Sequence, residues 1–503
     1  MELCKRIVGA LTALVLVQAA GADDELFRLH EIAFDDRVVT GRFGDFNGDG
    51  RADLMTATIA GMPPEEDREL QVFLQRADGS FPDQPDRRME IPGHSAMYDI
   101  ADVKGTPGDE IVFLRPDRVT IASLAGTATQ RWDILIPPPT TVAAASDERG
   151  FDPFPLVYDE FDTEPWILVP QIGTLTAVTA EGDIRATLNV DRRANYFVAK
   201  TASLVSFESD VQLFLDVPKM SIGDVNGDGL ADIVSATRHE IRTFLRSPDG
   251  GFPAEPSVST ALSFISEADH LRGSGGLATT ARDINNDGRL DLLITHVEGT
   301  LVDTVTKSYV YLNRNGTWNI EQPDEEFAVN KTLSSDLLLN IDNDPELELV
   351  RIQLKFTVLE MVELLLQRKL DTVIAIHELG DDGRYGEKPW SEKKLSTGIN
   401  FETFRPRGFM PRAELDMNAD GYMDFVTSAD GDGLEVYLGG ERGPFRRRAG
   451  MQEFPSPGRI IFDDINGNNL PDFVLFDPQK PGTPVRVGVN TGSLLANARA
   501  GSD

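Results

Sequence analysis

The sequence is short of cysteine and of positive charge. It has one Cys among 503 residues, which excludes an intrachain disulfide framework and a Cys-based zinc site. Lys and Arg number 48 against 82 Asp and Glu, so the net charge is −34. This deficit of cations argues against nucleic acid or an anionic membrane as a main partner, because both are bound through Lys and Arg. The acidity favours cations as ligands.

Histidine is also scarce, and no catalytic spacing is found. None of the six His lies in a zinc-binding spacing such as His-Glu-x-x-His. The sequence is rich in turn formers instead, with 44 Gly and 30 Pro, and 41% of the residues are apolar. That apolar fraction is enough for a sizeable core. Frequent turns between apolar segments are typical of an all-β chain.

The only long apolar run lies at the N-terminus. Lys5 and Arg6 precede a run from Ile7 to Ala20 that is apolar apart from two residues, and Ala20-Gly21-Ala22 is a small-x-small cleavage site. This pattern predicts a secretory signal peptide over residues 1–22, cleaved after Ala22. An uncleaved membrane anchor is the alternative, although the run is shorter than the roughly 20 residues of a bilayer span. We therefore expect a secreted or periplasmic protein with no membrane span after cleavage.

One nonapeptide, Asp-x-Asn-x-Asp-Gly-x-x-Asp, recurs through the rest of the chain. Complete copies begin at residues 45, 224, 283 and 416, weaker copies at 340 and 464, and eroded copies at 102 and 159. The eroded copies lack the polar pattern but keep the apolar runs that follow each motif. The eight starts are about 60 residues apart, so the repeats fill the chain from 23 to 493 and leave a short tail at 494–503.

The flanks of each motif predict a small β-sheet. Apolar runs such as Leu54–Ile59 and Leu70–Leu74 follow the first motif, and three or four short strands in about 60 residues are typical of a propeller blade. Only two strands follow the last motif, and an unassigned strand, Leu26–Phe34, precedes the first. We therefore predict an all-β β-propeller closed by an N-terminal strand. Eight blades are expected, with seven as the alternative; an open solenoid or a string of sandwiches would be other arrangements of the same strands. One short helical insertion is expected near 359–369.

The motif spacing predicts calcium loops. Oxygen ligands stand at positions 1, 3, 5 and 9, position 7 can offer a backbone carbonyl, and the Gly at position 6 permits a sharp turn. The flanks are strands and position 12 carries no Glu, so the loops are not EF-hands. We expect about four or five Ca²⁺ ions. The candidate ligands in the four complete loops are Asp45, Asn47, Asp49, Arg51, Asp53, Asp224, Asn226, Asp228, Leu230, Asp232, Asp283, Asn285, Asp287, Arg289, Asp291, Asp416, Asn418, Asp420, Tyr422 and Asp424.

Two further loops are less complete. The loop beginning at Asp464 carries Asn where the complete copies have Asp and Gly, and its candidate ligands are Asp464, Asn466, Asn468 and Asp472. The loop beginning at Asn340 has Pro345 at the turn, and whether either loop binds metal stays open. An Asp/Asn/Gly loop can also be simply a good turn former.

The repeat resembles the FG-GAP/VCBS repeat, which forms the blades of the integrin α-subunit propeller and of many secreted bacterial propellers. The resemblance covers nearly all of the chain after residue 22. It implies a calcium ion in the loop between the first two strands of a blade, and a partner on the opposite face, as in integrins. The units at 102 and 159 depart from the ligand pattern, so the resemblance implies no metal there.

The sequence favours a binding or scaffold module for an extracellular protein or glycan. The alternative is a secreted polysaccharide lyase, because some propellers with similar loops have an active site in the central mouth. No residue spacing singles out a catalytic group, and the ligand is not specified by the sequence.

Overall fold

The computed structural model describes most of the chain beyond residue 24. The described ranges are 25–61, 66–126, 128–137, 139–142, 151–161, 164–190, 194–200, 209–215, 217–266, 275–299, 303–355, 357, 360, 364, 366–380, 382–400, 405–428, 430–440, 445 and 448–495. The predicted signal peptide and most of the C-terminal tail lie outside the described residues. Among the described residues, no helix is long and apolar enough to cross a membrane.

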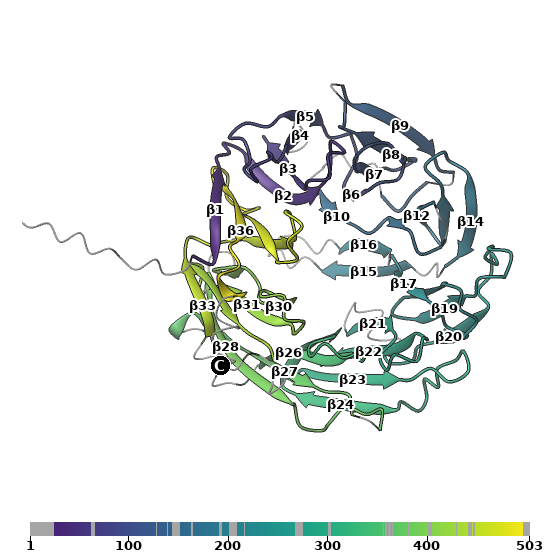
Figure 1. Ribbon diagram of the computed structural model, residues 1–503. Coiled ribbons are helices and arrows are strands. Elements are labelled where there is room, and N and C mark those ends of the chain that lie inside the picture. Colours follow the sequence, from purple (N-terminus) through teal and green to yellow (C-terminus); the bar gives the residue numbers. More distant parts are fainter. Residues whose placement is uncertain are drawn as a thin grey trace, which may run out of the picture.

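Eight small sheets stand in a ring, which confirms the all-β fold and the eight blades (Figure 1). Blade 1 consists of β2(Arg37–Gly44), β3(Asp53–Ala60), β4(Asp67–Phe73) and β5(Arg87–Glu90), and blade 2 of β6(Met97–Ala101), β7(Glu110–Leu114), β8(Arg118–Ser123) and β9(Gln130–Leu135). Blade 3 consists of β11(Val157–Tyr158), β12(Trp166–Gln171), β13(Thr174–Val178) and β14(Ile184–Asn189), and blade 4 of β17(Lys219–Gly223), β18(Asp232–Ala236), β19(Glu240–Phe244) and β20(Val258–Ala261). 

The remaining blades follow the same order around the ring. Blade 5 consists of β21(Gly276–Arg282), β22(Asp291–Glu298), β23(Val305–Tyr311) and β24(Glu325–Asn330), and blade 6 of β25(Thr332–Leu339), β26(Glu348–Lys355), β27(Lys369–His377), β28(Ser391–Asn400) and β29(Arg405–Pro406). Blade 7 consists of β30(Arg412–Leu415), β31(Asp424–Ser428), β32(Gly433–Tyr437) and β33(Arg448–Glu453). Blade 8 consists of β34(Arg459–Asp463), β35(Asp472–Phe476) and β36(Val485–Asn490), joined by β1(Phe27–Ile32).

The N-terminal strand closes the ring as predicted. Strand β1 pairs antiparallel with β36, from Phe27 opposite Asn490 to Ile32 opposite Val485, and supplies the fourth strand of blade 8. The side-chain amide of Gln452, in blade 7, accepts from Phe27 N at 2.7 Å and donates to Phe27 O at 2.8 Å. The Phe27 ring is fully buried and packs edge-on against Phe473 at 4.9 Å. The closure therefore joins both ends of the chain and two neighbouring blades.

The hydrophobic core lies between blades rather than inside one of them. Eight clusters of buried side chains occupy the eight blade junctions in turn. The cluster between blades 8 and 1, for example, joins Phe43 and Leu54 to Val474 and Phe476. Each blade therefore buries its two faces only when both neighbours are present, as in other closed repeat folds.

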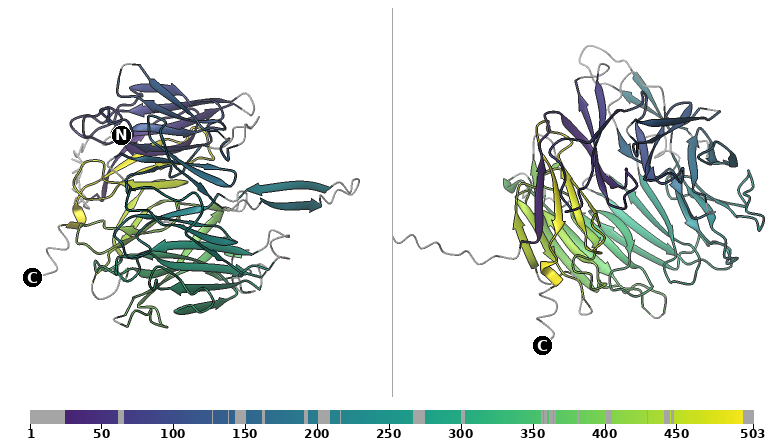
Figure 2. Two further views of the ribbon diagram at one scale, coloured as in Figure 1. Left: turned by 90° about the vertical axis from the view of Figure 1, so that its right-hand side faces the viewer. Right: turned by 45° about the horizontal axis from the view of Figure 1, so that its top comes forward.

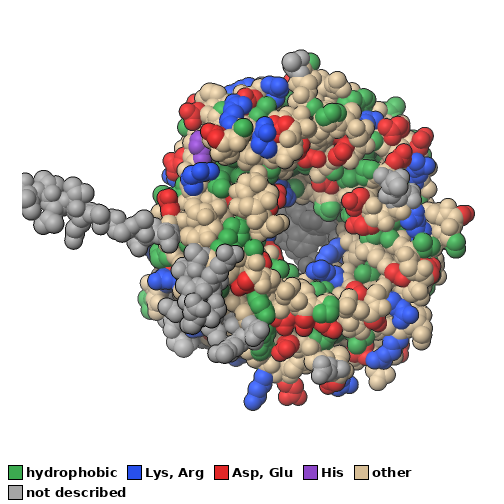
Figure 3. Space-filling model, in the orientation of Figure 1, with side chains coloured by type: hydrophobic (Ala, Val, Ile, Leu, Met, Phe, Trp, Pro, Cys, Tyr) green, Lys and Arg blue, Asp and Glu red, His purple; other side chains and the backbone are tan. Residues whose placement is uncertain are grey.

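Two elements interrupt the regular repeat, and the sequence did not reveal them. Strand β10(Asp152–Pro153) pairs parallel with β6 on the inner side of blade 2. The hairpin of β15(Ala194–Lys200) and β16(Ser209–Leu215) pairs with no blade and projects from the ring (Figure 2). The space-filling view shows the opening at the centre of the ring, with Lys or Arg at its edge (Figure 3).

Five of the eleven residues of the predicted helix over 359–369 lie outside the described residues, and its last residue, Lys369, begins β27 instead. Within it, Glu360, Leu364, Leu366 and Gln367 are helical. Strand β26 precedes it, and a short helix covers residues 493–495 near the C-terminus.

The antiparallel order gives the ring two distinct faces. Every nonapeptide loop joins the first strand of a blade to the second, so all of these loops lie on one face with the connections from third to fourth strand. We call this the motif-loop face. The hairpin connects β14, the last strand of blade 3, to β17, the first strand of blade 4, and so emerges on the opposite face, which we call the hairpin face.

Candidate metal centres

The four complete loops share one hydrogen-bond scaffold around the first Asp. Its carboxylate accepts the N–H of the Gly at position 6, with distances of 2.7–2.8 Å from Gly50 to Asp45, Gly229 to Asp224, Gly288 to Asp283 and Gly421 to Asp416. Each of these Gly residues has φ between 79° and 90°, a conformation that costs a residue with a Cβ about 1 kcal/mol or more. The sequence therefore predicted the turn correctly, and the scaffold folds each loop around its acidic side chains.

Positions 3 and 5 are also held in place by backbone groups. In the second complete loop, Asn226 Oδ1 accepts from Asp228 N at 2.9 Å and Asp228 Oδ1 accepts from Leu230 N at 2.9 Å. The other complete loops bond the position-5 carboxylate in the same way. Arg51, at position 7 of the first loop, places its guanidinium on Asp49 instead of leaving that carboxylate free. The other position-7 residues, Leu230, Arg289 and Tyr422, occupy the corresponding turn positions.

Position 9 differs from the other predicted ligands because its carboxylate is part of the fold. Asp53, at the start of β3, is fully buried; Oδ2 accepts from Phe46 N at 3.1 Å and Oδ1 from Gln75 N at 2.8 Å, just beyond β4. Asp232, Asp291, Asp424 and Asp472 each bridge the loop to the third strand in the same way. This carboxylate fastens the motif loop to its blade, a role that the motif alone does not reveal.

Burial raises the pKa of these bridging carboxyls. Desolvation is the main cause, and the acidic residues at positions 5 and 1 add to it, whereas the backbone N–H groups oppose it. The pKa is raised to about 7 for Asp53 and Asp291, to about 8 for Asp424 and to about 6 for Asp472. In unfolded chains an Asp titrates near 3.9.

These shifts predict that the metal-free protein is more stable in mild acid. The folded state binds protons more tightly than the unfolded state, so this stabilisation is complete below about pH 4 and is lost as pH rises through 6–8. In metal-free buffer the urea concentration at the unfolding midpoint should therefore decrease as the pH is raised from 5 to 8. Calcium should reduce the dependence, because it replaces the protons. Repeating the series in 0.5 M salt screens surface repulsion; a midpoint that rises with pH would contradict the prediction.

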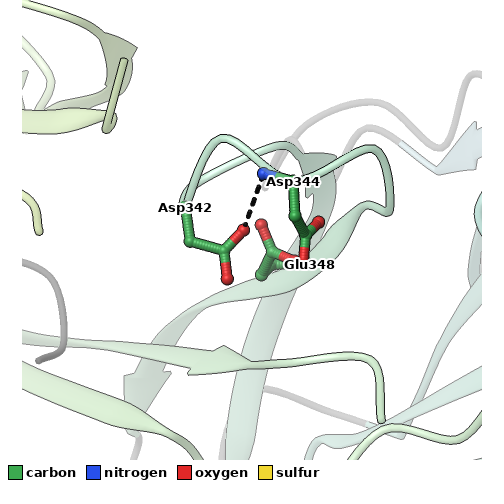
Figure 4. Close-up of side chains that lie close together, drawn as sticks. All are labelled: Asp342, Asp344 and Glu348. Atoms are coloured by element: carbon green, nitrogen blue, oxygen red, sulfur yellow. Dashed lines mark hydrogen bonds between the residues drawn. The ribbon is translucent and has the colours of Figure 1, made fainter. Parts of the chain in front are cut away.

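The structure brings three carboxylates together in the Asn340 loop, for which the sequence did not decide whether metal binds. Among the described residues, Asp342, Asp344 and Glu348 form the one group of at least three acidic, His or Cys side chains whose ligand atoms all lie within 4.8 Å of one another (Figure 4). They stand at positions 3, 5 and 9 of the Asn340 loop. By the same criterion, the carboxylates of the four complete loops do not converge.

The remaining loops depart from the pattern in different ways. The Asp464 loop keeps the scaffold, with Asn469 N donating to Asp464 Oδ2 at 2.7 Å and Asn468 Oδ1 accepting from Leu470 N at 2.8 Å. In the eroded loop at 102, Glu110 is buried and accepts from Val103 N and Lys104 N. That loop has kept a buried carboxylate at position 9 and Asp102 at position 1, but the other Glu110 oxygen accepts from Thr106 Oγ1 within the loop. The eroded loop at 159 has Pro165 before β12 and no carboxylate at position 9.

The sequence profile of the FG-GAP-like repeat family matches residues 224–294, which cover the second and third complete loops and strands β18 to β21 between them. The chain is a β-propeller that carries an FG-GAP-like repeat. The profile and the ring of eight blades together confirm the resemblance seen in the sequence.

No curated protein matches the FG-GAP propeller. Solved structures with a similar fold include a lectin of Agrocybe aegerita that recognises non-reducing terminal N-acetylglucosamine, with 14% identity over 92% of this chain and 87% of that chain at a TM-score of 0.38. The biofilm matrix protein Bap1 of V. cholerae is 12% identical over 93% and 91%, with a TM-score of 0.33. Sqt1 of Chaetomium thermophilum is 12% identical over 92% and 98%, with a TM-score of 0.43. Such likenesses assign no function to this chain.

Proposed function

We propose that this FG-GAP propeller is a secreted, calcium-stabilised binding or scaffold module for an extracellular protein or glycan. The observation that carries the proposal is the hairpin β15–β16, which pairs with none of the eight blades and projects from the hairpin face (Figure 2). A two-stranded hairpin is marginally stable alone in water, so it contributes little to the ring. Because the hairpin is not needed to build the ring, we expect its role to be contact with a partner.

The base of the hairpin adjoins a small apolar pocket. The pocket has a volume of about 300 Å³ and is lined by Tyr158 and Pro170 of blade 3 and by Val217 and Met220, which follow the hairpin. Its size is at the lower end of the range for small-ligand sites. Hairpin and pocket together make the hairpin face the side on which we expect a partner. The motif loops lie on the other face.

Calcium fits the complete loops on the chemistry of their donors. Each offers two carboxylates and an amide oxygen at positions 1, 3 and 5, with the buried carboxylate of position 9 beside them. Asn418 supports the assignment, since its Oδ1 atom is buried without a hydrogen-bond partner while Nδ2 donates to Asp420 at 2.9 Å. The same four positions of each loop would hold the ion, and its effect would be to neutralise charges crowded into one turn.

Exchanging the hairpin for a short Gly/Ser linker tests the binding role. Replacing residues 194–215 should leave the melting temperature of the ring nearly unchanged, because the hairpin contributes to no blade. Binding to a partner, found by screening the secreted protein against glycans and cell-surface proteins with and without calcium, should be lost. Unchanged partner binding would refute the hairpin face as the binding side. Release of unsaturated products from acidic polysaccharides, followed by ultraviolet absorbance, would instead favour the lyase alternative.

Asp228→Ala tests the calcium loops one at a time. Asp228 is exposed and its bond to Leu230 N is worth only about 1 kcal/mol, so the metal-free protein should lose little stability. The gain in stability on adding calcium should fall by the contribution of one ion, about a quarter of the total for four equal loops. The exposed Asp83, outside every motif loop, provides the matched control as Asp83→Ala. An undiminished calcium response in Asp228→Ala would show that this loop binds no ion.

A further inference from the structure

A large groove lies between blades 5 and 6 on the motif-loop face. Its volume is about 1360 Å³, and its two walls are β24 of blade 5 and the connection from β27 to β28 of blade 6, residues 378–390. The motif loops of the two blades contribute Asn285, Asp344 and Glu346. Pockets for small ligands are typically about 300–1,000 Å³, so this groove has room for a segment of a larger molecule.

The groove is far more acidic than the chain as a whole. Eight of its 19 lining residues are Asp or Glu and two are Lys or Arg, a net charge of −6, whereas Asp and Glu are 82 of the 503 residues of the chain. Calcium in the motif loops would leave six of these carboxylates in place, because they lie outside every loop. They are Asp324, Glu325, Glu326, Glu378, Asp382 and Glu387. The groove is therefore complementary to a ligand with several positive charges.

Three of these carboxylates are available to pair with a ligand. Glu326, Glu378 and Glu387 are exposed, and no ion pair to them is found among the residues that the structure describes. Trp390, half-buried, lines the same groove and packs against the hydrophobic cluster between blades 6 and 7. Lys and Arg side chains pair with carboxylates and stack favourably on an indole ring, so both features select the same two residue types.

Hydrogen bonds hold the two walls together without a ligand. Tyr385 of the connection is buried, and its N–H donates to Glu325 Oε1 of β24 at 2.7 Å. Its hydroxyl donates to Leu347 O at 2.6 Å. At the end of β27, His377 Nδ1 donates to Gly386 O at 2.8 Å. The groove is therefore preformed, which lowers the entropic cost of binding.

The wall formed by β24 has an unpaired edge. This strand is the last of blade 5: it pairs with β23 on one side and, within the described part of the chain, with no strand on the other. The consecutive residues 324–328 all line the groove. Because side chains alternate between the two faces of a strand, an unbroken run of lining residues places the groove along the strand edge. An extended peptide can add to such an edge through main-chain hydrogen bonds.

We propose that the groove between blades 5 and 6 binds an extended, Lys/Arg-rich peptide segment of another protein, which adds as a strand to β24. The basic side chains of the segment pair with Glu326, Glu378 and Glu387. This surface lies on the face opposite the hairpin, so it is a second binding site and does not rest on the function proposed for the hairpin face.

Charge reversal in the groove tests its selectivity, with a labelled peptide of alternating Lys or Arg and Val as the probe. Glu326→Lys/Glu387→Lys reverses one exposed carboxylate on each wall and should raise the dissociation constant, measured by fluorescence anisotropy, at least about tenfold. Asp36→Lys/Asp83→Lys gives the same net charge from exposed residues outside the groove and should change it less than about twofold.

Two results of this comparison would overturn the proposal. They are unchanged binding by the folded groove variant and equal weakening by both pairs of substitutions. Should the groove pair fail to fold, Glu387→Lys alone, in the exposed connection, is subject to the same outcomes.

Hydrogen exchange tests the addition of a strand in the same samples. Amide exchange in residues 325–330 should slow when the peptide binds, because the open edge of β24 becomes paired. Spermine carries several positive charges but no peptide groups, so it should bind more weakly and leave the exchange unchanged. Peptide binding without slower exchange, or spermine binding as tightly as the peptide, would overturn the peptide strand as the occupant.

The variant in which a linker replaces residues 194–215 separates the two binding faces. It should bind the basic peptide as tightly as the parent protein does, whatever the outcome of the screen for a partner of the hairpin. Loss of peptide binding in that variant would place the peptide on the hairpin face and overturn the groove site.

Discussion

Deletion of residues 23–34 is expected to leave a protein that aggregates or melts at a much lower temperature. The deletion removes β1, so blade 8 keeps three strands and β36 exposes the N–H and C=O groups that now pair with Phe27–Ile32. An unpaired edge is a template for association with other chains. It also opens the buried cluster at the junction of blades 7 and 8, which includes Leu26 and Phe27. Size-exclusion chromatography and thermal melts measure both effects.

A single side chain in this strand should reproduce much of the loss. Phe27→Ala removes a fully buried ring that packs against Phe473, and such truncations cost about 3–5 kcal/mol. Arg28→Ala is the matched control, because Arg28 is exposed on the same strand and its loss should change the free energy of unfolding by about 0.5 kcal/mol or less. A truncated protein that stays monomeric and as stable as the parent would show that the ring does not depend on β1.

Removal of calcium is expected to have an effect of similar size. Extracellular calcium modules bind with dissociation constants around 0.1–1 mM, so about 5 mM calcium contributes about 1.1–2.3 kcal/mol at each site by mass action. Four complete loops would together contribute about 4–9 kcal/mol, estimated from the same relation. The melting temperature should therefore fall clearly when EGTA replaces calcium at neutral pH.

The rise in melting temperature should be selective for calcium, and it should decrease stepwise as individual loops are disabled. Magnesium at the same concentration should restore little, because it prefers a rigid octahedral site and loses its water reluctantly. Each loop disabled by an Asp→Asn change at position 5 should remove one increment. Equal melting temperatures in EGTA and in calcium would mean that the acidic loops are turns held by their own hydrogen bonds.

The strand rhythm and the loop positions could be predicted from the sequence because both are local. Strand β3 after Asp53 and strand β7 after the eroded loop at 102 appear where the apolar runs indicated them. The N-terminal strand was predicted by the strand count of the last unit. Loop ligands at positions 1, 3 and 5 are near one another in the chain, so their spacing alone defines a turn that gathers oxygen atoms.

The role of position 9 could not be read in this way. The partners of Asp53 include Gln75, 22 residues away beyond another strand, and those of Asp232 include Arg246, 14 residues away. Such contacts exist only when the blade has formed. The exchange of Asp for Glu348 looks minor in the sequence, yet the structure leaves Glu348 Oε1 without a hydrogen-bond partner and brings a carboxylate oxygen of Glu348 within 4.8 Å of ligand atoms of Asp342 and Asp344.

By itself, the sequence determined that this protein is a ring of β-blades with acidic loops, because a repeated local pattern specifies repeated local structure. Only the tertiary structure decided which loop brings three carboxylates together and from which face of the ring the hairpin projects. Those features depend on backbone groups and blades that are distant along the chain, and their positions are fixed only when neighbouring blades pack their apolar faces together.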